Sequence, residues 1–275
     1  RRQRQMCIRD SDITLTGIAA RSPMGIEGTE HVSAAQKLYY EPNKNLSVQV
    51  YGSMFFMNSY DLIQDMTFSQ SRDFMAGIKA KYTIKDWFTV NLSLHNDFYD
   101  RFKRHERIDI RKKVYQSKIF QPRLTLTSNY FSGHSIIFGI EHTTDELTSD
   151  RFVNRKMTTR ALHETEYFLQ DEWTADNHWM LSTGVRTNFS KAFGFMYMPK
   201  IAVKYSPDEH WAVRANYSMG YRAPSIKELF FNWDHLGMFQ IRGSEDLKPE
   251  KNHYCSLGAE YTNKGFFMNV NAYAC

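Results

Sequence analysis

The chain of 275 residues carries 35 basic and 30 acidic side chains, which leaves a formal net charge of +5. So small a surplus excludes a dedicated polyanion binder, because nucleic-acid modules concentrate far more basic charge on one face. Apolar residues make up 42% of the chain and exclude wholesale disorder, while only 7 Pro and 14 Gly argue against fibrous or low-complexity classes. Three cysteines spread over the whole length predict neither a disulfide framework nor a zinc cluster.

The two ends of the sequence indicate a piece of a longer protein. Residues 1–11 lack the apolar stretch of a secretory signal, and we expect a non-native leader of the kind that adaptor read-through produces. A genuine basic arm is the alternative. At the other end, Cys275 stops the chain inside a run that alternates like a strand. We therefore expect residues 12–275 to form one partial domain.

Apolar and polar residues alternate along most of the chain, which is the pattern of β-strands. Clear runs in chain order are 74–84, 88–95, 179–186 and 211–221. One run is mixed: Tyr167 and Leu169 share a face with Asp171, while Phe168 lies among polar neighbours. Alternation alone does not explain this run.

Such runs amount to about eleven strands, each near the 9–11 residues that a tilted strand needs to cross a bilayer. Soluble strands average only about 5–6 residues. No stretch of about 18 apolar residues predicts a transmembrane helix. We therefore expect an all-β fold, an antiparallel meander that forms part of a transmembrane β-barrel. A soluble β-sandwich or propeller is the alternative.

The predicted connections alternate between short and long. Short turns rich in Gly, Asn, Asp and Pro are expected at 85–86, 132–134, 174–177, 206–209 and 263–265. Longer polar loops are expected at 58–72, 100–118, 147–162, 190–196 and 222–251. Because antiparallel strands reverse direction each time, all short turns should lie at one rim, as in outer-membrane barrels. Aromatic residues at strand ends, such as Trp87 and Trp179, predict interfacial girdles.

An odd strand count does not fit a closed bacterial barrel, since single-chain barrels use even numbers. We therefore expect an open section of a larger barrel, such as the roughly 22-stranded plugged transporters. We expect the plug of such a transporter to be missing from this chain.

Two blocks between residues 220 and 261 carry the strongest motif signal. The first reads Gly-Tyr-Arg-Ala-Pro-Ser-Ile-Lys-Glu-Leu from Gly220, and the second reads Asp-Leu-Lys-Pro-Glu from Asp246. They resemble the G-[FY]-R-A-P-S-x-K-E-L and G-N-x-D-L-K-P-E blocks of TonB-dependent outer-membrane receptors. The motif residues are Tyr221, Arg222, Ala223, Pro224, Asp246, Leu247, Lys248, Pro249 and Glu250.

Within that family, the chain resembles HmuR-like haem receptors, which carry [FY]-R-A-P, a loop histidine and N-P-[ND]-L. The first element matches at residues 221–224 and His235 lies in the following loop, but residues 244–247 keep only the Asp and Leu of the third. The resemblance implies that His235 binds haem iron, as a neutral imidazole can. Arg222 is expected either to pair with a haem propionate or to pair with a loop carboxylate.

Two local features adjoin these motifs. Pro224 is expected to end a strand and open a short helical turn, with Glu228 at the capping-box offset from Ser225. The basic run at 101–113 is expected to be an external loop, either solvated or in contact with anionic outer-leaflet lipid.

The resemblance implies an outer-membrane receptor of the Gram-negative type, for energy-coupled uptake of haem or another iron source. Its implied partners are the ligand, the TonB energy-coupling protein acting through the missing plug, and outer-membrane lipid. A siderophore or cobalamin importer is one alternative, and a non-transporting surface-binding barrel is another. No Gly-rich phosphate loop or Gly-x-Ser-x-Gly elbow is present, so no enzyme, catalytic residue or catalytic cofactor and no nucleic-acid partner is expected.

Overall fold

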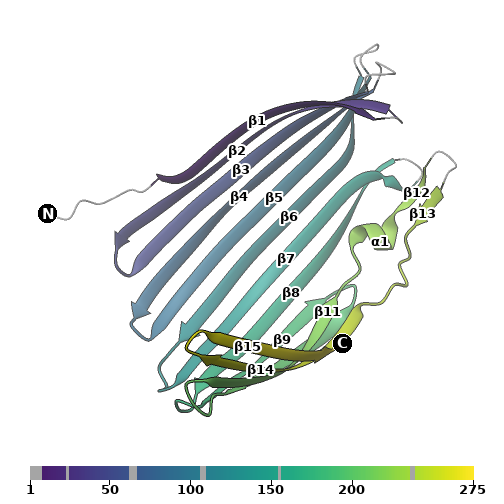
Figure 1. The fold of residues 1–275 in the computed structure, drawn as a ribbon. Coiled ribbons are helices and arrows are strands. Elements are labelled where there is room, and N and C mark those ends of the chain that lie inside the picture. The colour runs from purple at the N-terminus through teal and green to yellow at the C-terminus, as the bar shows by residue number, and fades with distance from the viewer. Residues whose placement is uncertain (1–7, 23–24, 62–66, 106–109, 154–155, 236–238) are drawn as a thin grey trace.

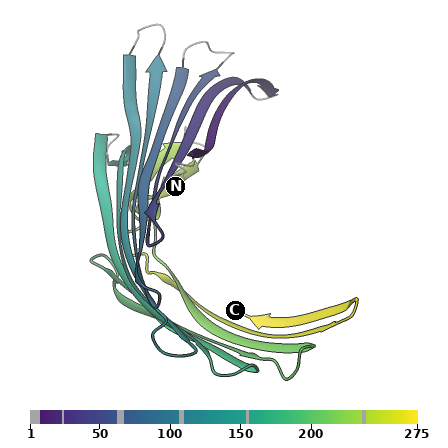
Figure 2. The ribbon, with the colours of Figure 1, turned by 90° about the vertical axis from the view of Figure 1, so that its left-hand side faces the viewer.

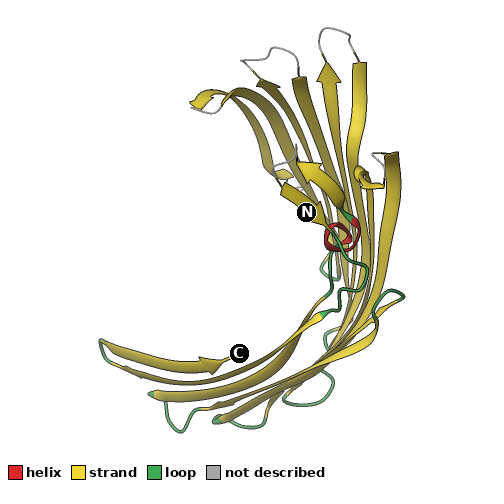
Figure 3. Ribbon diagram, turned by 90° about the vertical axis from the view of Figure 1, so that its right-hand side faces the viewer, coloured by secondary structure: helices red, strands yellow, loops and turns green. Residues whose placement is uncertain are grey.

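The computed structural model describes residues 8–22, 25–61, 67–105, 110–153, 156–235 and 239–275. In this part of the chain, thirteen strands form one antiparallel sheet in the order β1 to β11, β14 and β15, and β12 and β13 form a separate hairpin (Figure 1). The large sheet bends into an open arc, seen from two sides in Figures 2 and 3. This is the meander of a partial barrel that the sequence predicts.

The elements follow one another along the chain with few interruptions. They are β1 (Ile8–Ser22), β2 (Gly25–Asn43), β3 (Leu46–Asp61), β4 (Thr67–Lys85), β5 (Phe88–His105), β6 (Ile110–Ser128), β7 (His134–Val153), β8 (Lys156–Thr174), β9 (Trp179–Ser190), β10 (Gly194–Tyr205), β11 (Trp211–Arg222), α1 (Ile226–Phe230), β12 (Asn232–His235), β13 (Phe239–Arg242), β14 (Glu250–Asn263) and β15 (Phe266–Ala274).

The strands are longer and more numerous than the sequence predicts. β7 has 20 residues and β2, β4, β6 and β8 have 19 each, instead of about eleven at most. Three expected loops, at 58–72, 100–118 and 147–162, are largely continued strand. Both faces of these extensions carry polar residues, so the sequence no longer alternates between apolar and polar residues there. The backbone N–H and C=O groups of neighbouring strands still form hydrogen bonds, because this pairing does not depend on the side chains. The expected loop at 190–196 is also wrong, because β9 and β10 pair up to Ser190 and Gly194.

The expected leader at residues 1–11 overlaps the first strand. β1 begins at Ile8, inside the expected leader, and pairs with β2 from there. Residues 1–7 lie outside the described part of the chain.

The five predicted short turns all lie at one rim, but the opposite rim also has a short turn, the three-residue turn 191–193 between β9 and β10. Asn43, Asp176 and Asp208 each accept two backbone N–H bonds, at 2.7–3.0 Å, from the residues two and three positions ahead. Gly133 and Gly265 have φ of 76° and 87°, a left-handed conformation that glycine adopts without steric cost. Side-chain caps and glycines thus allow tight reversals at this rim, while the long extensions lie at the opposite rim (Figure 1).

The two faces of the sheet differ in polarity. The convex face is apolar: Ile78, for example, pairs across β3–β5 with Val50 and Leu94, and is 37% exposed. The concave face holds cross-strand ion pairs, such as Arg123–Glu141 at 3.4 Å, Arg186–Glu166 at 2.9 Å and Arg214–Glu260 at 2.7 Å. An exposed apolar belt outside and paired charges inside are the arrangement of a barrel wall in lipid.

The mixed run of β8 is explained by its neighbours. Phe168 points to the concave face, where its ring lies over Gly139 and under the guanidinium of Arg123, 4.9 Å away. Asp171 is on the convex face but only at the short-turn rim, where His134 Nδ1 lies 2.8 Å from its carboxylate. The positions of Phe168, under a cation on the inner face, and of Asp171, beside His134 at the rim, are therefore both compatible with a barrel wall.

Aromatic rings line the short-turn rim. Trp87 contacts Tyr130 with ring centroids 5.0 Å apart, Trp179 contacts Tyr205 at 4.3 Å, and Trp211 contacts Tyr261 at 4.8 Å. These amphipathic rings form the girdle that the sequence predicts at this interface.

The first prediction concerns the apolar outer face. Leu169 is 49% exposed there, between Phe138 and Val185. Replacing it (Leu169→Arg) should lower the free energy of unfolding of the membrane-inserted protein by about 2–4 kcal/mol, measured by urea titration in lipid vesicles.

The neighbouring concave-face variant Gln170→Arg is the matched control. Gln170 already donates to Glu172 at 3.0 Å, and an arginine keeps that contact, so a change within about 0.5 kcal/mol is expected. Equal losses in both variants would contradict the assignment of faces.

Candidate ligand-binding site

The segment between β11 and β14 folds inward over the concave face. Figure 3 shows α1 and the β12–β13 hairpin on the inner side of the arc. Ile226 and Phe231 pack there against Leu147 and Phe152 of β7 in a small buried cluster. The expected loop at 222–251 is therefore a packed element, held by apolar contacts to the wall.

The start of α1 has the predicted capping box. The Ser225 hydroxyl accepts from the Glu228 N–H at 3.3 Å, and the Glu228 carboxylate accepts from the Ser225 N–H at 2.8 Å. Pro224 is buried just before this cap. The reciprocal bonds fix where α1 begins, because they satisfy N–H groups that no helical carbonyl can reach.

Arg222 joins three elements at the end of β11. Its guanidinium donates to Glu250 at 3.0 Å and to Glu228 at 2.6 Å, so two carboxylates hold it. The backbone N–H of Ser225 and the Arg222 guanidinium together lower the pKa of Glu228 to about 2. Of the two expected roles of Arg222, pairing with loop carboxylates is the one seen in this structure.

The second motif block closes the segment against α1. The backbone of Gly243 lies so near that a Cβ there would be 2.7 Å from the Glu228 carbonyl oxygen and from the Leu229 carbonyl carbon. The Ser244 N–H donates to the Glu228 carbonyl at 3.0 Å. Residues 246–249 then lead to Glu250, the first residue of β14. The two sequence blocks are thus in contact through α1.

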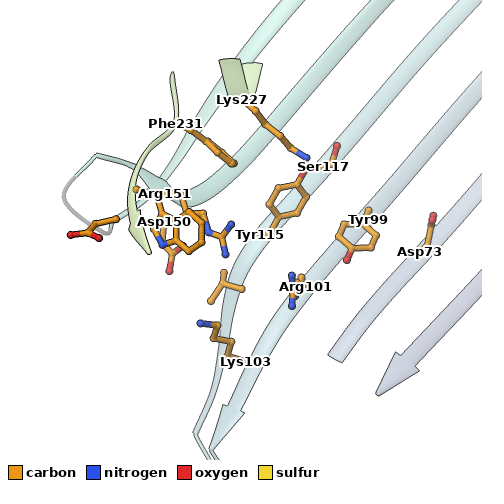
Figure 4. A pocket seen from close by; sticks show the side chains of 13 residues that line it. Asp73, Tyr99, Arg101, Lys103, Tyr115, Ser117, Asp150, Arg151, Lys227 and Phe231 are labelled. Atoms are coloured by element: carbon orange, nitrogen blue, oxygen red, sulfur yellow. The ribbon is translucent and has the colours of Figure 1, made fainter. Parts of the chain in front are cut away.

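A groove of about 860 Å³ lies between this segment and the inner face of the extended strands (Figure 4). Its cationic lining residues are Arg101, Lys103, Arg151 and Lys227, its aromatic ones are Tyr99, Tyr115, Phe231 and Trp233, and its acidic ones are Asp73, Asp150 and Asp234. Cations and flat rings near the rim opposite the predicted short turns can hold an anionic, aromatic ligand.

The strand register and the inward segment place these side chains together. Arg101 of β5 is opposite Tyr115 of β6. The Lys227 ammonium of α1 lies 5.2 Å from the Tyr115 ring centroid, and the Arg151 guanidinium of β7 lies 4.0 Å from the ring of Trp233 on β12. The groove therefore exists only when the 223–249 segment is folded onto the wall.

The predicted haem ligand is at the edge of this groove. His235 ends β12, where its backbone pairs with Phe239. Its side chain lies outside what the structure describes. Its strand neighbours Trp233 and Asp234 line the groove, whereas Arg222 is not a lining residue.

Sequence reasoning missed most of the wall of this groove. Tyr99, Arg101 and Tyr115 fell in or beside a predicted loop, and only the alternation of inward positions in a continued strand could have identified them. In the part of the chain that the structure describes, no three His, Cys, Asp or Glu side chains gather as a metal site. No helix in that part is long and apolar enough to cross a membrane.

The second prediction concerns Glu228 and pH. The pKa of Glu228 in the folded protein is about 2, below its ordinary value of 4.5. The contribution of Glu228 to the stability of the α1 segment should therefore be complete above about pH 4.5 and lost as the pH falls towards 2. Amide hydrogen exchange of residues 225–231 should show this loss relative to Glu228→Leu, whose side chain accepts no hydrogen bond and which should be poorly protected at every pH.

Glu245→Gln is the control on the same segment, since the Glu245 side chain is exposed. It should exchange like the unmodified protein. Equal protection in Glu228→Leu and the unmodified protein at pH 7 would contradict the anchoring role of Glu228.

Comparison with protein families gives one match over most of the chain. The family model described as "TonB dependent receptor-like, beta-barrel" matches residues 25–274. An iron-regulated outer membrane virulence protein of Vibrio cholerae is 25% identical over 193 residues, which are 68% of this chain and 28% of that protein. The chain thus spans less than a third of this curated relative.

Solved structures share the fold at low identity. A mutant of the ferric enterobactin receptor PfeA of Pseudomonas aeruginosa aligns with a TM-score of 0.75 and 13% identity, over 90% of this chain and 42% of that one. The siderophore receptor PirA of the same organism aligns with a TM-score of 0.69 and 12% identity, over 90% and 46%. The matched region is a section of these larger barrels.

Proposed function

Because the chain belongs to the TonB-dependent receptor β-barrel family, we propose that the complete protein imports an iron complex by energy coupling. The chain itself is part of an integral β-barrel of the outer membrane. In such barrels the long extensions are external and the short turns periplasmic. The groove is therefore at the external end of the lumen, where a ligand arrives.

The groove supports an anionic iron chelate of the siderophore type as the ligand. Its four cations outnumber its three acids, and its four aromatic side chains offer flat apolar surfaces. Charge-assisted bonds and cation–π contacts are strengthened where water is displaced from such a groove. The names of the structural relatives, a ferric enterobactin receptor and a siderophore receptor, support the same ligand class.

The chain's own residues would capture the ligand and hold it. Lys227 and Phe231 come from the inward segment, and Arg101 and Tyr115 from the wall, so a bound ligand would bridge the two. Release would then require the segment or the lumen below it to move. We assign that step to a plug and the TonB protein, which act outside this chain.

Haem is the second candidate ligand. It is supported by the position of His235, which follows two groove-lining residues on β12, and by the Tyr-Arg-Ala-Pro match. An imidazole there would bind iron, while the cations would pair with propionates.

The third prediction tests the groove. Lys227→Gln removes a cation but keeps the helix, and should weaken binding of ferric enterobactin by the complete receptor about tenfold, or ~1.4 kcal/mol. Fluorescence quenching titration measures this affinity. The control Lys264→Gln lies in a periplasmic turn, and should bind like the unmodified receptor. Unchanged affinity in Lys227→Gln would exclude the groove as the site.

The fourth prediction separates the two ligands. If haem is the ligand, His235→Ala in the complete receptor should weaken haem binding at least tenfold and shift the haem absorption band, because an axial ligand is lost. Ferric enterobactin binding should then be absent from both proteins. Unchanged haem affinity would remove the haem candidate and leave the siderophore type.

A further inference from the structure

The basic run at 101–113 is divided between the two faces of the barrel. It is not the loop that the sequence predicts, because β5 continues to His105 and β6 begins at Ile110. Side chains alternate along a strand, so Arg101 and Lys103 point into the groove, while Phe102 and Arg104 point outward. Arg107 lies outside the described residues.

The outward half forms what we call the outer basic cluster. It consists of Arg72, Arg111 and Lys113 around the ring of Phe102. Arg72 and Arg111 place their guanidinium carbons 4.6 and 3.9 Å from the ring centroid, and the Lys113 ammonium is 5.5 Å away. Phe102 is only 9% exposed although it is on the convex face, because these cations cover it.

A buried carboxylate holds two members of the cluster in place. Asp100 is 1% exposed and pairs with Arg72 at 3.0 Å and with Lys113 at 2.9 Å. Gln116 donates to the same carboxylate at 3.0 Å. Among the described side chains of the cluster, three cations face one acid, so the cluster keeps a surplus of two positive charges on a fixed frame. Next to it, Lys118 and Glu146 lie 3.9 Å apart and balance each other.

The cluster lies directly beyond the apolar belt. The row Phe74–Phe98 belongs to the belt, and the row Arg72–Asp100 is two residues further out on the same face. Two residues of strand cover about 7 Å, which is the step from acyl chains to head groups. The external rim faces the outer leaflet, so the cluster is at the level of that leaflet's head groups.

We propose that the outer basic cluster binds the phosphate groups of a phosphorylated lipid of the outer leaflet. A planar guanidinium such as that of Arg111 matches phosphate geometry, and Arg111 is exposed. The acyl chains of the same lipid would contact the belt at Phe74, which is 38% exposed. Charge and apolar contact thus select a lipid over a soluble anion. This site is on the opposite face of the wall from the ligand groove, and it does not depend on which iron complex is carried.

The test uses the complete receptor in phosphatidylcholine nanodiscs that contain a minor share of bisphosphorylated lipid A. Arg111→Gln should retain about threefold less lipid A than the unmodified receptor, measured by native mass spectrometry. The difference should shrink as salt is raised, because exposed charges are screened. With dephosphorylated lipid A, the two proteins should retain equal amounts.

Lys112→Gln is the matched control. Lys112 is adjacent in sequence, but it pairs with Lys103 in the inward row, and its ammonium is 3.9 Å from Asp150. It should behave like the unmodified receptor, since a loss there would indicate unspecific attraction and overturn the proposal. Equal retention by Arg111→Gln would also overturn it. Displacement of lipid A by inorganic phosphate at equal concentration would assign the cluster to a soluble anion instead.

Discussion

Backbone hydrogen bonding between neighbouring strands is the interaction on which the rest of this structure depends. In hydrocarbon, an unpaired N–H or C=O costs several kcal/mol, so each strand must be paired along its whole membrane-spanning length. The ladder does not stop at the membrane, because the same bonds remain available in water. β4 and β5 thus stay paired from Lys85 and Phe88 to the far rim at Thr67 and His105. The strands therefore extend beyond the membrane-spanning region, and these extensions supply one wall of the groove.

In a continuous sheet, the residues of each strand alternate between the two faces. In the segment 101–113, the inward positions supply Arg101 and Lys103 to the groove, while Phe102 and its cations form the outer basic cluster. The same rule explains Phe168, which is an inward ring covered by Arg123. Successive side chains of a strand point to opposite faces of the sheet. A segment whose sequence is basic or irregular throughout therefore contributes to two separate surfaces.

The segment between β11 and β14 forms the second side of the groove, opposite the strand wall. Its apolar contacts through Ile226 hold it on β7, and Arg222 ties its start to its end through Glu228 and Glu250. Both motif blocks therefore serve the positioning of the segment, one by capping α1 and the other by closing on it. Groove-lining residues such as Lys227 and Trp233 lie between these anchors.

Alternation, turn residues and the two motif blocks by themselves determined the all-β meander, the rim of short turns, the family resemblance and the capping box of Ser225 and Glu228. These are local properties, fixed by residues close in sequence. The strand count, the extent of β5 and β6, the partners of Arg222 and the wall of the groove were decided only by the tertiary structure. Register and inward folding bring together residues such as Arg101 and Lys227, which are far apart along the chain. No pattern within one strand can specify such contacts, because backbone pairing is insensitive to side-chain type.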